Sequence, residues 1–124
     1  MIYFLMPAFN EETEIGPRLR NISALMAQKG FAFQIWVVND GSRDRTVNIV
    51  EEISRELPVR MIHHDRNRGI GVAFSNGLKE LIKVARDDDI IITLDADNTH
   101  NLETVGLMLM KIDEGYEVVS VPVL

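Results

Sequence analysis

The sequence predicts an α/β fold: a Rossmann-like, mostly parallel, doubly wound sheet of about five strands with helices on both faces. Short apolar runs alternate along the chain with longer segments whose apolar residues recur at helical spacing. The links between these segments are short, which favours right-handed crossovers between parallel strands. The run 90–94 is continuously apolar, as expected of a parallel strand that is covered on both faces.

The chain opens with a strand and a helix. A strand is expected at 2–6 and is closed by Pro7. A helix follows, opened by Gly16 and Pro17 and ended by Gly30. This order predicts the first strand–helix unit of the sheet.

Two more strands and a helix come next. A strand at 33–38 is followed by Asn39-Asp40-Gly41-Ser42, which has the composition of a turn. Asp44 or Thr46 then caps a second helix, and a shorter strand is expected at 59–63.

The second half of the chain repeats the alternation. A Gly-rich turn leads into a helix whose apolar face is formed by Phe74, Leu78, Leu81, Ile82 and Ala85. After the strand at 90–94, Asn101 caps a helix that Gly115 closes, and a last strand is expected at 117–121.

Composition limits the function classes. The 124 residues suffice for one domain, 1–124. The net charge of −6 and the lack of a basic stripe argue against nucleic-acid binding. The chain has no cysteine, so a disulfide framework, a thiol nucleophile and a thiolate zinc site are excluded. No apolar run is long enough to span a bilayer, and a cytoplasmic location is expected.

The strand at 90–94 ends in Asp95-Ala96-Asp97, where open α/β sheets place their ligands. Alternation along a strand turns Asp95 and Asp97 to the same side. Two carboxylates held so close repel each other unless a cation lies between them, and Mg²⁺ or Mn²⁺ suits oxygen ligands. A helix cap beside one solvated charge remains the alternative interpretation.

Three further polar turns are expected at the same edge of the sheet. Pro7 to Glu12 combines the Phe9 ring with hydrogen-bonding side chains, which suits a flat heterocycle; a packed ring among solvated glutamates is the alternative. In the second turn Asp40 can accept a hydrogen bond from a base or a ribose, or can simply form the turn. In the third, Arg66 to Gly71, backbone amides and the charge of Arg68 suit phosphate.

Histidines are weaker candidates for the site. His63 and His64 are neighbours on a strand, so they face opposite ways and are expected to be structural. His100 follows the paired aspartates and is a candidate substrate contact.

Together the four turns resemble family 2 glycosyltransferases, and most closely the dolichyl-phosphate mannose synthase group. The resemblance is carried by the order and spacing of Pro7-Ala8-Phe9-Asn10-Glu11, Val37 to Thr46, Asn67-Arg68-Gly69-Ile70-Gly71 and Leu94-Asp95-Ala96-Asp97. It implies the N-terminal half of a GT-A fold, as a nucleoside-diphosphate-sugar-binding domain over 1–124. It also implies transfer of a sugar from a GDP- or UDP-linked donor to an acceptor, including a polyprenyl phosphate, with Mg²⁺ or Mn²⁺ as cofactor.

The resemblance also implies roles for individual residues. The nucleotide-sugar-binding residues are expected to be Pro7, Phe9, Glu11, Asn39, Asp40, Arg68, Gly69 and Asp95. Asp97 is expected to be the main metal ligand, with Asp95 as the second. Asn39 stands where many members of the family carry Asp. No catalytic base is assigned, because the acceptor side is expected to lie outside these 124 residues. A full-length protein is expected to be peripheral to the inner face of a membrane.

Two other functions remain open. The run ending at Thr99 also resembles the Asp-x-Asp-x-Thr motif of haloacid-dehalogenase-like phosphatases, in which Asp95 would be the nucleophile and Asp97 the acid/base. Alternatively, the chain is a non-catalytic nucleotide-binding half-domain that oligomerises through an exposed sheet edge and the apolar tail 118–124. A monomeric mass in solution would count against that homo-oligomer.

Overall fold

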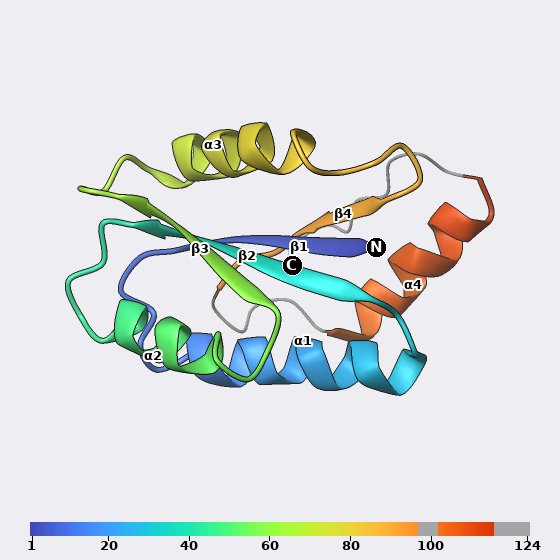
Figure 1. Cartoon of the computed structure of the whole chain (residues 1–124), viewed down its shortest axis with the longest axis horizontal. Helices are drawn as coiled ribbons and strands as arrows, with labels where there is room; N and C mark the ends of the chain where they lie inside the picture. Colours follow the sequence, from blue (N-terminus) through green and yellow to red (C-terminus); the bar gives the residue numbers. More distant parts are fainter. Residues whose placement is uncertain (97–101, 116–124) are drawn as a thin grey trace.

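The computed structural model describes residues 1–96 and 102–115 of the chain (Figure 1). Within these residues, four parallel strands form one sheet in the order β3-β2-β1-β4. The strands are β1 (Ile2–Ala8), β2 (Phe33–Asp40), β3 (Val59–His64) and β4 (Ile90–Thr93). The predicted parallel α/β sheet is confirmed, while the strand expected at 117–121 lies outside the described residues.

Helices cover both faces of the sheet, as the sequence predicts. The helices are α1 (Ile15–Lys29), α2 (Thr46–Ile53), α3 (Ile70–Ile82) and α4 (Leu102–Asp113). Figure 1 shows α3 above the sheet and α1 and α2 below it. Val105 and Leu109 of α4 belong to the same buried cluster as residues of α1, so α4 packs on the α1 side.

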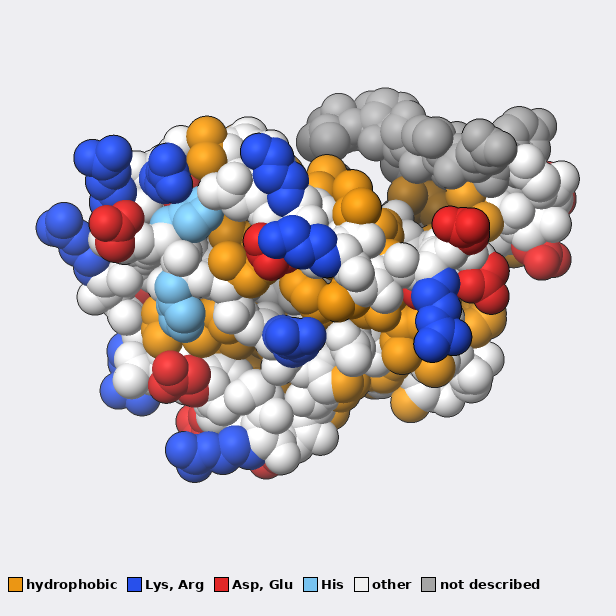
Figure 2. Space-filling model, turned by 45° about the horizontal axis from the view of Figure 1, so that its top comes forward, with side chains coloured by type: hydrophobic (Ala, Val, Ile, Leu, Met, Phe, Trp, Pro, Cys, Tyr) orange, Lys and Arg blue, Asp and Glu red, His pale blue; other side chains and the backbone are white. Residues whose placement is uncertain are grey.

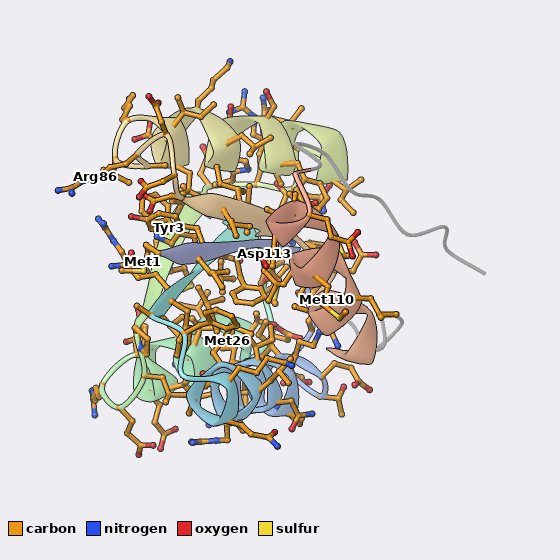
Figure 3. The ribbon with its side chains drawn as sticks, turned by 90° about the vertical axis from the view of Figure 1, so that its right-hand side faces the viewer. Met1, Tyr3, Met26, Arg86, Met110 and Asp113 are labelled. Carbon is orange, nitrogen blue, oxygen red and sulfur yellow. The ribbon has the colours of Figure 1, made fainter. Side chains whose placement is uncertain are left out.

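The strand β1 lies inside the sheet, between β2 and β4, and is paired with both. Every residue of β1 is buried. Phe4 and Met6 pack into the cluster beneath α1, whereas Tyr3 and Leu5 pack against α3. Figure 3 shows Tyr3 directed toward the α3 layer and Met26 of α1 in the opposite layer.

The expectation that the run 90–94 is covered on both faces is only partly right. Ile92 and Leu94 are buried, but Ile90 and Ile91 are half-buried and Thr93 is exposed. The reason is topological: β4 is an edge strand among the described residues, so its outer side lacks the cover that β1 has.

Two strand ends differ from the expectation. The first strand continues through Pro7 to Ala8. The Leu5 carbonyl accepts from the Leu94 amide, so the backbone groups of Leu5 face β4. The backbone of Pro7, two residues further on, also faces β4, but it lies beyond the last β1–β4 pair, Leu5 with Thr93. A missing N–H costs nothing there.

The second strand also runs further than its turn-like composition indicates. Asn39 and Asp40 are its last two residues and pair with His63 and His64 of β3. Both are buried, so the turn begins only at Gly41. The pairing with β3 therefore overrides the local turn preference of these residues.

The predicted apolar face of α3 is confirmed for Leu81, which is buried, and for Phe74, Leu78 and Ala85, which pack against the buried cluster, but not for Ile82. Ala73, Gly77 and Leu81 are its buried residues, and Ile82 is 66% exposed. A Cβ on Gly77 would lie 2.5 Å from Leu5 Cδ1, so the helix approaches the sheet through a glycine. Gly30 and Gly115 end α1 and α4 with positive φ, as predicted. Within the described residues, no helix has the length and apolarity that crossing a membrane requires.

Candidate functional site

A cleft of about 390 Å³ opens at the carboxyl edge of the sheet, where the end of β2 meets the segments that follow β1, β3 and β4. It is lined by Pro7, Ala8, Phe9, Glu11, Asp40, Asn67, Gly69, Ile70, Asp95 and Ala96. The structure thus brings together the predicted site residues Pro7, Phe9, Glu11, Asp40, Gly69 and Asp95. Residues of all four predicted polar segments therefore line one cleft, although the second contributes only Asp40, the last residue of β2.

The cleft is lined by both apolar and acidic side chains. The Phe9 side chain is 44% exposed and that of Ile70 is 60% exposed, although both are large and apolar. Carboxylates of Glu11, Asp40 and Asp95 are also at its wall. Exposed apolar surface beside a few hydrogen-bonding groups suits a flat heterocycle that carries polar substituents.

Asp40 anchors the Gly-rich turn that forms one wall of the cleft. Its Oδ1 accepts from the backbone N–H of Arg68 at 2.9 Å, and its Oδ2 accepts from that of Gly69 at 3.0 Å. Its Oδ1 also lies 2.8 Å from Nδ1 of His64. Burial opposes ionisation of Asp40, but the hydrogen bonds from His64 and from the two amides outweigh it and lower its pKa.

These bonds change the interpretation of the Gly-rich turn. The sequence suggested that amides of this turn face a phosphate, yet the amides of Arg68 and Gly69 donate to Asp40. Arg68 is not among the residues that line the cleft, whereas its neighbours Asn67, Gly69 and Ile70 are. Asn67 and Ile70 belong to the same motif as the predicted Arg68 and Gly69, so their place in the motif was the signal that could have identified them.

Asn39 lies behind the cleft rather than at its wall. It is 5% exposed, its Nδ2 donates to Nδ1 of His63 at 3.1 Å, and its Oδ1 accepts from the Ser42 amide at 2.9 Å. Successive strand residues face opposite sides of a sheet, so Asn39 and Asp40 point away from each other. The contact of Asn39 with a base or ribose stays a prediction, since the structure places it in the turn's own hydrogen bonding.

A glycine brings the second and third turns into direct contact. Gly41 has φ +78°, and a Cβ on it would lie 2.4 Å from the carbonyl carbon of Arg66 and 2.5 Å from the amide nitrogen of Asn67. No side chain fits there, because the obstructing atoms belong to the backbone. Gly41 therefore fixes the spacing between the turn after β2 and the turn before α3.

The first and second turns are joined by reciprocal hydrogen bonds. Asn10, which has φ 52°, donates from its amide to Ser42 Oγ and accepts at Oδ1 from the Arg43 amide. The remaining bonds run from Glu11 N–H to Thr46 Oγ1 at 2.8 Å, from Glu12 N–H to Asp44 Oδ2 at 3.2 Å, and from Arg45 N–H to Glu12 Oε2 at 3.2 Å. The loop that carries Phe9 and Glu11 is thereby fixed to the start of α2. Asp44 also accepts from the Thr46 amide, but the N-cap of α2 is Arg45, so neither Asp44 nor Thr46 occupies the predicted cap position.

The predicted metal ligands fall partly inside the described residues. Asp95 is half-buried and lines the cleft, whereas Asp97, like His100, lies outside the described residues. Within residues 1–96 and 102–115 there is no group of three or more acidic or histidine side chains that could hold a metal ion. A carboxylate in a cleft still fits Mg²⁺ or Mn²⁺, because such ions are commonly held by one or two carboxylates together with substrate phosphates.

A second hollow, of about 610 Å³, lies at the opposite edge of the sheet. Met1, Met110 and Asp113 border it, and Figure 3 looks onto this edge. The hollow is lined mainly by apolar residues and lacks the convergent turns of the cleft. Figure 2 shows the face that α3 covers, where Lys and Arg side chains are scattered among other types rather than gathered into a stripe. The cleft is therefore the better functional candidate.

The chain is similar to known proteins across nearly all of its length. Residues 3–124 match the model of the family described as Glycosyl transferase family 2. The chain is 37% identical over 117 residues to an uncharacterized protein of Methanocaldococcus jannaschii, covering 94% of this chain and 44% of that protein. It is 31% identical over 121 residues to the undecaprenyl-phosphate 4-deoxy-4-formamido-L-arabinose transferase of Pseudomonas fluorescens, covering 96% of this chain and 34% of that protein.

The chain is also similar to solved structures. Residues 1–349 of S. aureus TarS in complex with UDP-GlcNAc match with a TM-score of 0.69 and 26% identity, covering 98% of this chain and 36% of that one. The chain spans less than half the length of these relatives. The fold corresponds to the N-terminal half of a GT-A domain, and the match to the family model over residues 3–124 shows that the protein belongs to glycosyltransferase family 2.

Proposed function

We propose that this chain is the nucleotide-sugar-binding part of a glycosyltransferase that transfers a sugar from a UDP- or GDP-linked donor. The observation that carries the proposal is the cleft, where the segments after β1 and β4 bring Phe9, Glu11 and Asp95 together. Support also comes from the TarS structure in complex with UDP-GlcNAc, which shares this fold. The family membership removes the support for the phosphatase alternative.

The cleft suggests a division of roles. The base would lie against the exposed side chains of Phe9 and Ile70, with Glu11 able to accept hydrogen bonds from its edge. Asp95, together with Asp97, would hold a divalent cation, Mg²⁺ or Mn²⁺. Such a cation, when bound, neutralises charge on the departing nucleoside diphosphate.

The acceptor is proposed from the relatives alone. The P. fluorescens relative is named as an undecaprenyl-phosphate transferase, which supports a polyprenyl phosphate as the acceptor class. Such an acceptor resides in a membrane, so the complete protein would work at a membrane surface. The dolichyl-phosphate mannose synthase-like subgroup, the cytoplasmic location and the homo-oligomer stay predictions.

Titration calorimetry tests the donor site directly. UDP, GDP and their sugar conjugates are titrated into the chain with Mn²⁺ and with EDTA. We expect one of the two nucleotides to bind, and Mn²⁺ to strengthen its binding by about tenfold or more, because the cation offsets the repulsion between diphosphate and carboxylates.

A matched pair of variants makes this test specific. Asp95→Asn should remove most of the gain from Mn²⁺ because it removes a carboxylate at the cleft. Asp88→Asn removes an exposed carboxylate that borders the opposite hollow, so it should retain the gain. Equal binding with Mn²⁺ and with EDTA, or no nucleotide binding at all, would contradict the proposal.

A further inference from the structure

Three hydrogen-bonded polar side chains, two of them buried, connect α3 to the cleft. They run from Asn76 on α3 through His64 on β3 to Asp40 at the end of β2. His64 is 9% exposed and Asp40 is 3% exposed. The parallel register places His64 directly opposite Asp40, so the contact is built by the pairing of β2 with β3.

The direction of the two hydrogen bonds that link these side chains follows from the chemistry of Asn76. Asn76 Nδ2 lies 3.0 Å from His64 Nε2, and an amide nitrogen can only donate. Nε2 is then the acceptor, so the single hydrogen of the neutral imidazole is on Nδ1. That hydrogen is donated to Oδ1 of Asp40, at a distance of 2.8 Å. Asn76 thereby selects the tautomer of His64 that can hold Asp40.

Asp40 in turn fixes the position of the turn that forms one wall of the cleft. Its two oxygens accept the amides of Arg68 and Gly69, the two residues that precede α3. Gly69 and Ile70 line the cleft directly. If the carboxylate rotated, both amides would lose their acceptor, and this wall would no longer have a fixed position.

We propose that His64 is a positioning residue: it orients Asp40 so that Asp40 holds the turn at Arg68 and Gly69 in the shape that binds the nucleotide sugar. The binding part of this inference rests on the function proposed above. His64 does not line the cleft, so its effect passes through Asp40 alone. Its neighbour His63 is exposed and bonds Asn39 on the other face of the sheet, so it has no part in this chain of contacts.

Two substitutions separate positioning from general stability. In His64→Asn the amide nitrogen is bonded to Cγ, as Nδ1 is in histidine, so a donor to Asp40 is retained while the acceptor for Asn76 is lost. In His64→Leu both are lost. A purely structural role predicts that both variants lose stability and nucleotide affinity together.

Amide hydrogen exchange, measured residue by residue by NMR, reports whether the amides of the turn keep their hydrogen bonds. We expect His64→Leu to speed exchange of the Arg68 and Gly69 amides by about tenfold or more, the scale of one lost buried hydrogen bond. His64→Asn should keep both amides within about threefold of the wild type, although its melting temperature falls. His63→Leu is the control and should leave both amides unchanged.

Nucleotide affinity, measured by calorimetry with Mn²⁺, should follow the same order. His64→Leu should weaken binding by about tenfold, and His64→Asn should restore most of it. Equal affinity and equal exchange in these two variants would overturn the inference. If the wild type binds no nucleotide, the proposed function fails, while exchange at Arg68 and Gly69 still decides whether His64 holds the turn.

One measurement needs no substitution. When both rings are neutral, two-bond proton–nitrogen spectra should show the hydrogen on Nδ1 of His64 and on Nε2 of His63. The opposite tautomer at His64 would overturn the inference even if the His64→Leu variant did not fold.

Discussion

Gly77 sets the distance between α3 and the sheet. A Cβ at this position would lie 2.5 Å from Leu5 Cδ1 and 2.9 Å from Val38 Cγ2. Gly77→Ala gains helix propensity of about 1 kcal/mol but overpacks the core at a cost of about 1–3 kcal/mol. We expect the free energy of unfolding in urea to fall by about 1 kcal/mol.

Gly71 offers a matched control in the same helix. Nothing lies within 4 Å of a Cβ built on it, so Gly71→Ala should leave the stability unchanged or raise it by up to about 1 kcal/mol. A Gly77→Ala variant as stable as Gly71→Ala would show that Leu5 can move aside and that the close approach does not require glycine.

Neighbouring elements position the cleft through contacts between their loops. Thr46, the first residue of α2, is fully buried, accepts the Glu11 amide at Oγ1 and donates its hydroxyl to Asp44. Thr46→Val keeps the shape but leaves the Glu11 amide without this acceptor. We expect the free energy of unfolding to fall by about 1–3 kcal/mol, the cost of an unsatisfied buried group.

Thr46→Val should also disturb the cleft, because Phe9 and Glu11, which belong to the same loop, both line the cleft. Ser54→Ala is the control: Ser54 is exposed, its hydroxyl donates to the local carbonyl of Glu51, and its loss should change stability by less than about 0.5 kcal/mol. Equal stability of the Thr46 and Ser54 variants would contradict the role of Thr46 in joining the loops.

Two hydrogen-bonded carboxylates, those of Asp40 and Asp44, lie near the carboxyl edge of the sheet, and this has a consequence for acid stability. The pKa of Asp40 and that of Asp44 are both lowered: burial opposes ionisation in each case, and hydrogen bonds to the carboxylates outweigh it. Because the folded-state pKa lies below the unfolded value, ionisation stabilises the fold fully above that unfolded value. This stabilisation is lost as the pH falls through the folded-state pKa.

Urea unfolding at a series of pH values measures this dependence. We expect the free energy of unfolding to decline below about pH 4, the ordinary range of an aspartate, and Asp40→Asn to flatten the decline while lowering stability at pH 7. Asp88→Asn, at an exposed site, should change stability at pH 7 by less than about 0.5 kcal/mol. An unchanged acid slope in Asp40→Asn would show that Asp40 contributes none of this linkage.

Much of the fold and part of the site could be predicted from the sequence, because local patterns carry them. The alternation of apolar runs and helical stripes gave the parallel α/β sheet, and Gly30 ended α1 as its conformational freedom predicts. The polar turns had to meet at one edge, since parallel strands all end on the same side. That is why Phe9 and Asp95, far apart in the sequence, could be assigned to one site.

Other features depend on partners that no local pattern identifies. Asn39 and Asp40 have turn composition, yet pairing with β3 makes them strand residues. Ile82 was misplaced because α3 meets the sheet through Gly77, a packing choice that helical periodicity does not reveal.

The sequence by itself therefore determined the class of the fold, the edge at which the site forms and the family. The tertiary structure alone decided that Asp40 holds the amides of Arg68 and Gly69 with His64 behind it. The physical reason is that strand order and register set which side chains meet. Register is fixed by packing across the whole sheet, whereas composition and periodicity record only what each segment prefers on its own.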